Sequence, residues 1–264
     1  MVRGWTSFLP LLVSFAGVAS ASIFGPDDRV AVGHGRGSPF APIGVAYDPS
    51  SNRYGTAFLV DECHALTAEH ITSDGQTDPR GVRVAFGVGQ APNGQFERRT
   101  GGTVVASGGF NEKKWNRDAD WLLLSLDQCL GREYGYVRLR AGSGGHGDSA
   151  FLSAGYPSDP APIRGLLVVD PGCHLVGEAA RLWLNTCAGQ PGDSGGPLFQ
   201  MAQTPHGPRL EVYAIQAAAD SRYVANEPDR SDFNPARPFT GLNEAVPVAN
   251  ILPRISKFIR PVAS

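Results

Sequence analysis

The sequence predicts an all-β protein of the sandwich or barrel type. Short runs of β-branched, aromatic and aliphatic residues recur roughly 8–12 residues apart, with turn-forming residues between them. Glycine and proline, which favour turns, number 33 and 21 among the 264 residues. Only the last segment has clear helical periodicity, so a parallel sheet covered by helices is not expected.

Nine apolar runs are the expected strands. The first, IGVAY, ends at the turn sequence DPSSN, and the turn between the third and fourth contains Pro92, Asn93 and Gly94. In chain order, the expected strands are 43–47, 55–60, 82–89, 103–109, 121–126, 136–140, 150–156, 166–170 and 210–219.

The segment 248–259 is the expected C-terminal helix. Its apolar residues recur at helical spacing, which gives it one apolar face. Pro253 is compatible with a helix only near the start, where its missing N–H group is tolerated. The apolar face consists of Val248, Ile251, Leu252, Ile255 and Ile259.

The first 21 residues have the organisation of a secretory signal peptide. Arg3 precedes an apolar run from Phe8 to Val18, and the small residues ASA provide a cleavage site after Ala21. The run is too short for a membrane anchor, since crossing a bilayer takes about 20 apolar residues. We expect an exported protein, secreted or periplasmic, whose mature chain begins near Ser22.

A glycine-rich stretch, RAGSGGHGD at 140–148, divides the mature chain into similar halves. We therefore expect an N-terminal domain at 22–141 and a C-terminal domain at 142–264. A polar, proline-rich stretch at 220–241 is expected to be a surface loop.

Composition and charge argue against some classes of partner. The chain is 42% hydrophobic, enough for one large or two smaller cores, and its formal net charge is −2. Basic and acidic residues are interspersed, whereas nucleic-acid binders carry a one-sided basic surface. We expect a monomer with no nucleic-acid partner and no membrane anchor.

The cysteines Cys63, Cys129, Cys173 and Cys187 fit an exported chain. Their even number indicates two disulfides, although four cysteines allow three pairings. Cys173 with Cys187 would close a short loop, and Cys63 with Cys129 would then join two segments of the first half. A zinc site is not indicated, because no two cysteines are two to four residues apart.

The stretch GQPGDSGGPLF, at 189–199, contains the strongest motif. It could be only a glycine-rich turn, but GDSGGP would arise by chance roughly once in tens of thousands of chains of this length. Its Ser194 is the candidate nucleophile. A serine hydroxyl needs a nearby base, a carboxylate that orients the base, and donors for the developing oxyanion.

His70 is the candidate base, since it lies in CHALTAEH directly after the expected strand GTAFLV. The candidate carboxylate is Asp120 at the head of WLLLSL, where it can be desolvated and still point at one partner. Asp118 is the alternative. HALTAEH matches neither H-E-x-x-H nor H-x-x-E-H, so we expect no metal and no cofactor. The remaining histidines are His34, His64, His146, His174 and His206.

In this order, LTAEH, DWLLLSL and GDSGGPLF resemble the signature regions of the chymotrypsin/trypsin-like serine peptidases. FGPDDR and AGYP are more similar to the secreted bacterial branch that includes the glutamyl endopeptidases. The resemblance, from about Ile23 to the terminal helix, implies two six-stranded antiparallel β-barrels with the site between them. It also implies a serine endopeptidase acting on peptides or proteins. Ser194 would be the nucleophile, His70 the general base and acid, and Asp120 the orienting carboxylate. The N–H groups of Gly192 and Ser194 would form the oxyanion hole.

The same resemblance places the substrate pocket at Ala188 and along the strand after the serine. Ala188 stands where trypsin-like enzymes have an acidic residue, and Gln216 where glutamate-specific relatives have a histidine. A preference for small or medium neutral side chains is therefore expected. Ala217 replaces a serine that supports the aspartate, and Ala218 and Ala219 replace glycines of the groove.

Two neighbours of the candidate triad leave questions open. Glu69 precedes His70 where the family usually has a small residue, and its carboxylate would either act on the histidine or point to solvent. Asp193 is the residue that in the family often pairs with a freed N-terminal amine. Signal cleavage would produce such an amine near Ser22 or Ile23.

Two other functions compete with a peptidase. A catalytically inactive family member acting as a binding module is one, although such relatives usually lose a triad residue. An ester hydrolase is the other, because GDSGG matches G-x-S-x-G. That fold has the order serine, acid, histidine, whereas the order here is His70, Asp120, Ser194, so it is excluded.

Overall fold

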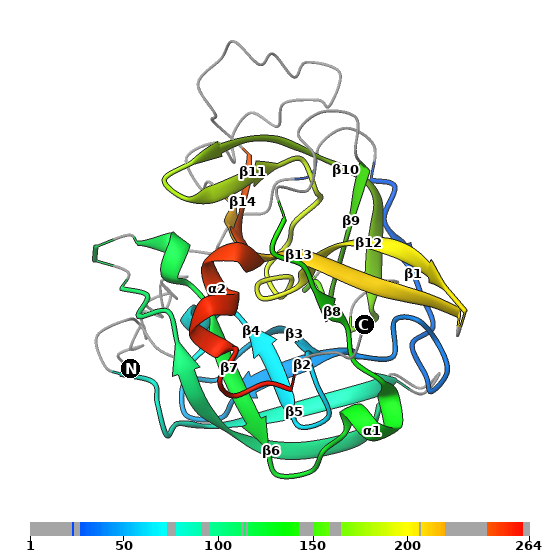
Figure 1. Cartoon of the computed structure of the whole chain (residues 1–264), viewed down its shortest axis with the longest axis vertical. Helices are drawn as coiled ribbons and strands as arrows, with labels where there is room; N and C mark the ends of the chain where they lie inside the picture. Colours follow the sequence, from blue (N-terminus) through cyan, green and yellow to red (C-terminus); the bar gives the residue numbers. More distant parts are fainter. Residues whose placement is uncertain are drawn as a thin grey trace, which may run out of the picture.

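The computed structural model contains two β-structures that pack against each other, which confirms the predicted all-β class (Figure 1). The predicted signal peptide, the turn at 92–94 and the loop at 220–241 lie outside the described residues. In the described part, no helix is long and apolar enough to cross a membrane. The structure describes residues 23, 27–72, 78–90, 95–111, 113–114, 116–142, 150–158, 165–205, 207–219 and 242–260.

The first β-structure is a closed antiparallel barrel in the order β2-β3-β4-β7-β6-β5. Its interior is filled by apolar side chains such as Leu59, Phe86 and Leu124, each 1% exposed or less. Closure leaves this ring without a free edge. Its strands are β2 Ile43–Asp48, β3 Arg53–Leu59, β4 His64–Thr67, β5 Arg83–Gln90, β6 Phe96–Ser107 and β7 Leu122–Leu126.

The second β-structure follows the order β1-β10-β11-β14-β13-β12-β9. Because β9 pairs with β10 as well as with β12, six of these strands form a ring, in agreement with the expected second barrel. The short β8 pairs in parallel with β13. The strands are β1 Val30–Ala31, β8 Arg138–Leu139, β9 Ala150–Gly155, β10 Val168–Ala179, β11 Leu182–Asn185, β12 Pro197–Thr204, β13 Gly207–Ala219 and β14 Asn243–Pro247.

The predicted C-terminal helix is present as α2, red in Figure 1, but it ends at Ile255 rather than at 259. After Ile255 the chain tightens, because the N–H group of Phe258 donates to the Ile255 carbonyl at 2.8 Å. The other short helical segments are α1, which was not predicted, and the 3-10 turns η1 and η2. The bounds are α1 Gly131–Tyr134, α2 Val248–Ile255, η1 Glu69–Ile71 and η2 Arg117–Ala119.

Two disulfides, Cys63–Cys129 and Cys173–Cys187, are formed, which settles the pairing that the sequence left open. The first joins two segments of the N-terminal half, and the second joins β10 to the segment after β11. A shared apolar cluster also connects the two β-structures, since Phe58 of the first contacts the same core as Phe199 of the second. The segments before β7 and around β14 are further joined by an ion pair between Arg117 and Glu244.

Candidate active site

His70 lies in η1 directly after β4 and faces Asp120, which follows η2 and precedes β7. Nδ1 of His70 is 2.7 Å from Oδ2 of Asp120, and the backbone N–H of His70 donates to Oδ1 at 2.9 Å. The Asp120 side chain is 2% exposed and that of His70 is 31% exposed. The pair is therefore buried at the carboxylate and accessible at the imidazole. Asp118 lies instead 3.6 Å from the guanidinium of Arg181.

Ser194 is partly exposed in the serine loop, residues 186–196 between β11 and β12. Gly55 shows how closely this loop approaches the histidine segment. A Cβ atom on Gly55 would lie 2.7 Å from the Ser194 carbonyl oxygen and 2.8 Å from Cγ2 of Ile71. Because Ile71 directly follows His70, the backbone of Ser194 lies close to the segment that contains His70.

Gly195 makes this approach possible. Its φ angle of +82° lies in the region that favours glycine. A Cβ atom there would collide with the carbonyl oxygen of Thr56 and would lie 2.6 Å from the backbone nitrogen of Ala68. The serine loop thus packs directly on the segment that leads into His70.

The backbone N–H groups of Gly192 and Ser194 have no acceptor among the described residues. Other amides of the loop are paired: the N–H of Asp193 donates to Gln190 at 2.9 Å and that of Gly195 to Gln216 at 2.7 Å. Unpaired donors on both sides of Asp193 suit a transient anion.

Asp193 is bound within the same loop. Its Oδ2 accepts a hydrogen bond from the backbone N–H of Gln190 at 2.8 Å, and a Cβ atom on Gly155 would collide with its Oδ1. The expected partner is an amine near Ser22 or Ile23, and of these two only Ile23 belongs to the described residues. The pairing of Asp193 with that amine stays a prediction.

The predicted pocket positions lie beside the serine loop and on β13. Ala188 and Ala217 are buried, with 4% and 2% of their surfaces exposed. Ala218 is partly exposed, and Ala219 is the last residue of β13. The side chains described at these positions are therefore small and neutral, with Gln216 as the polar one.

Two buried polar residues that sequence reasoning missed contact these positions. Asn185 donates to Oε1 of Gln216 at 3.3 Å, and Asp170 accepts a hydrogen bond from the backbone N–H of Ala188 at 2.5 Å. Their only signal in the sequence is a polar residue at the end of an apolar run, in LWLN and LLVVD.

Glu69 is buried, with 1% of its surface exposed, so it does not point to solvent. Its Oε2 accepts hydrogen bonds from the N–H groups of Gly109 and Phe110 at 2.9 and 3.1 Å, while Oε1 has no partner among the described residues. Burial raises the pKa of Glu69 to about 7, with a smaller contribution from the charge of Asp120. The ring of Phe110 packs edge-on against His70, with the ring centroids 6.3 Å apart.

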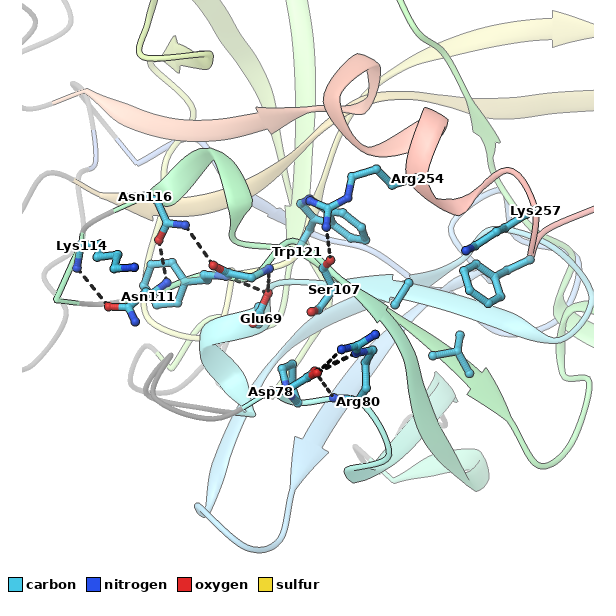
Figure 2. A pocket seen from close by; sticks show the side chains of 16 residues that line it. Glu69, Asp78, Arg80, Ser107, Asn111, Lys114, Asn116, Trp121, Arg254 and Lys257 are labelled. Atoms are coloured by element: carbon cyan, nitrogen blue, oxygen red, sulfur yellow. Dashed lines mark hydrogen bonds and ion pairs between the residues drawn. The ribbon is translucent and has the colours of Figure 1, made fainter.

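A cavity of about 570 Å³ opens beside Glu69, between the end of β6, the segment before η2, and α2 (Figure 2). Arg254 lies over the ring of Trp121, 5.0 Å from its centroid, and donates to the Ser107 carbonyl at 3.0 Å. The predicted triad and pocket residues do not line this cavity. It is therefore separate from the predicted substrate site.

The other histidines of the described part make different contacts. Nε2 of His34 is 2.6 Å from the hydroxyl of Tyr156, and burial lowers the pKa of His34. Nδ1 of His64 is 2.9 Å from Asp61. Among the described residues, no group of three or more His, Cys, Asp or Glu side chains is arranged to hold a metal. The histidines His146 and His206 lie outside the described residues.

No family model and no curated protein matches this chain, but solved structures do. A Glu endopeptidase in complex with MPD has a TM-score of 0.62 at 17% identity, covering 85% of this chain and 92% of its own. The protease Anisep from Arthrobacter nicotinovorans also has a TM-score of 0.62, at 14% identity, over 87% of this chain and 98% of that one. The thermostable serine protease AL20 from an extremophilic microorganism has a TM-score of 0.53 at 14% identity, over 82% and 96%.

The chain therefore has the chymotrypsin-like fold of these serine proteases, as the resemblance of its motifs implied. At this level of identity the likeness concerns the fold. The activity of a protein with this fold depends on the residues of its site.

Proposed function

We propose that this protein is a serine endopeptidase that uses Ser194, His70 and Asp120. The observation that carries the proposal is a histidine held by both oxygens of a buried aspartate, next to a serine loop in which the N–H groups of Gly192 and Ser194 have no acceptor among the described residues. The fold shared with serine proteases supports it.

In the proposed reaction, Nε2 of His70 accepts the proton of the Ser194 hydroxyl as Oγ attacks a peptide carbonyl. The N–H groups of Gly192 and Ser194 stabilise the resulting oxyanion. His70, held by Asp120, then gives the proton to the leaving amine, and an acyl group remains on Ser194. Water then attacks this acyl group, with His70 again accepting the proton and Ser194 as the leaving group. These steps need no metal or organic cofactor.

For specificity, we infer a preference for small or medium neutral side chains. The small side chains of Ala188 and Ala217, with the carboxamide of Gln216, support this, since none of the three carries a charge. Cleavage kinetics on a peptide library would test it, and a strong preference for basic or acidic residues would contradict it.

We further infer that the protein acts outside the cytoplasm, secreted or periplasmic, as a monomer. Two disulfides fit an oxidising compartment, and the predicted signal peptide at 1–21 supports export. The amine freed near Ser22 or Ile23 would then reach Asp193. Full activity with an N-terminal extension left in place would count against this activation.

The test of the activity is labelling of the purified mature protein with a fluorophosphonate probe, beside Ser194→Ala and His70→Ala. We expect labelling of the wild type alone, because Oγ attacks the probe only when the base and the oxyanion donors are in place. Casein should likewise be cleaved by the wild type and not by the two variants.

The rival function gives a different result. A folded, disulfide-bonded wild type that is not labelled would favour the inactive binding module, once the intact mass has shown that the N-terminus is fully processed. An unprocessed N-terminus would indicate a zymogen instead.

A further inference from the structure

Thr56 of β3 is a buried residue that connects the first barrel to the serine loop. Its side chain is 0% exposed. The hydroxyl donates to the carbonyl oxygen of Gly192 at 2.8 Å and accepts from the backbone N–H of Tyr156 at 2.9 Å. The backbone N–H of Thr56 donates to the carbonyl oxygen of Ser194 at 2.8 Å. One residue thus holds the carbonyl groups of both residues that would supply the oxyanion hole.

The backbone N–H of a residue lies in the peptide plane that it shares with the preceding carbonyl, and the residue's own carbonyl lies in the next plane. At Gly192, the preceding plane is held because Ser158 donates to the Pro191 carbonyl at 2.7 Å. The following plane is held by two bonds, one from the Thr56 hydroxyl to the Gly192 carbonyl and one from the N–H of Asp193 to the Gln190 carbonyl. Gly192 joins the two planes with a φ angle of +101° and, as a glycine, has little steric resistance to rotation, so the place of its N–H depends on the bonds that hold both planes.

At Ser194 the planes are held by backbone groups only. Gly196 donates to the Asp193 carbonyl at 2.8 Å, and the N–H of Thr56 donates to the Ser194 carbonyl. A substitution of the Thr56 side chain therefore leaves the bonds around Ser194 in place. It removes one of the bonds that hold Gly192, together with the acceptor for the N–H of Tyr156.

We propose that Thr56 is a positioning residue whose hydroxyl anchors the Gly192 carbonyl and so keeps the adjacent N–H of Gly192 in place for the oxyanion, an inference that rests on the proposed function. A hydroxyl has one proton to donate, and the Thr56 hydroxyl donates it to the Gly192 carbonyl. Without it, that carbonyl and the N–H of Tyr156 lose a buried partner, and Gly192 with its N–H shifts as these groups find other partners. The change should weaken the stabilisation of the transition state, because that is where negative charge develops on the oxyanion.

The test compares Thr56→Val, Thr56→Ala and Thr56→Ser with the wild type. Valine keeps the shape and removes the hydroxyl, alanine leaves room for a water molecule, and serine keeps the hydroxyl. Thr100→Val is the matched control, because Thr100 is 8% exposed in β6 of the same barrel and its hydroxyl donates to the Gly101 carbonyl. Fluorophosphonate labelling gives kinact and KI without knowledge of the substrate, and thermal unfolding shows that each variant is folded.

We expect Thr56→Val to lower kinact about tenfold, because loss of a whole oxyanion donor costs about 100-fold or more and here one donor is only misdirected. KI should stay within about twofold, because the ground-state contacts are unchanged. Thr56→Ser should restore kinact to within about threefold of the wild type, and Thr100→Val should match the wild type.

Several results would overturn this inference while leaving the proposed function intact. One is a folded Thr56→Val with wild-type kinact, and another is a Thr56→Ser as impaired as Thr56→Val. A third result is that Thr56→Val and Thr56→Ala both fail to fold while Thr100→Val folds. Thr56 would then be needed for folding rather than for positioning the serine loop. An unlabelled wild type would overturn the proposed function, and this inference with it.

Discussion

At the scale of single residues, Glu69 shows how burial changes the behaviour of a carboxyl group. It has its ordinary pKa of 4.5 in the unfolded chain and a pKa of about 7 in the fold. The folded protein therefore binds the carboxyl proton of Glu69 more tightly than the unfolded chain does. The stability linked to Glu69 falls as the pH rises from about 4.5 through 7, and it changes little outside that range.

Glu69→Gln should remove this pH dependence. The amide oxygen of glutamine can still accept from the N–H groups of Gly109 and Phe110, but no charge forms in the buried site at high pH. Relative to the wild type, the free energy of unfolding of the variant should rise by about 2 kcal/mol between pH 5 and pH 8. Denaturant unfolding at several pH values measures it. Glu178→Gln, at an exposed position of β10, is the control and should show no such rise.

At the scale of elements, the serine loop depends on a backbone approach that only glycine allows. Gly195 combines a positive φ angle with a predicted Cβ collision, whereas Gly207, at the start of β13, has a φ angle of +102° and open space around it. The two positions therefore separate backbone strain from steric collision.

Gly195→Ala should lower the free energy of unfolding by about 3 kcal/mol, since strain and collision add, and Gly207→Ala by about 1 kcal/mol from strain alone. The Gly195 variant should also lose fluorophosphonate labelling, because the loop must move away from the segment before His70. Denaturant unfolding and labelling measure the two effects. Equal losses of stability would show that the collision is relieved elsewhere.

Some of the strands could be predicted from the sequence and others could not. Runs such as 43–47 and 121–126 became β2 and β7, because a short continuous apolar run is typical of a strand that is buried on both faces. The strands β4, β11 and β14 were missed: each has only four or five residues, and the chain around them is polar. The strand β12 was missed because it starts at Pro197 within the glycine motif and becomes polar toward its end.

At the scale of the whole molecule, the disulfides restrain two regions of very different size. Cys63 and Cys129 are 66 residues apart in the sequence, and Cys173 and Cys187 are 14 residues apart. A cross-link that closes a longer loop removes more entropy from the unfolded chain. The first disulfide should therefore contribute more to stability than the second.

Replacing each pair by alanine tests this. The double variant at Cys63 and Cys129 should lose about 4 kcal/mol of unfolding free energy, and that at Cys173 and Cys187 about 3 kcal/mol. Denaturant unfolding at one pH compares them. A larger loss for the short loop would mean that packing around Cys173 and Cys187, both 0% exposed, outweighs the entropy of the unfolded chain.

The sequence by itself determined the all-β class, most strands, the terminal helix and the motifs that contain His70, Asp120 and Ser194. These depend on local patterns of apolar, turn-forming and motif residues. Only the tertiary structure decided which cysteines pair, that Glu69 is buried, and that Thr56 holds Gly192, 136 residues away in the chain. The physical reason is that such contacts depend on how the two barrels pack, and no short stretch of sequence records that packing.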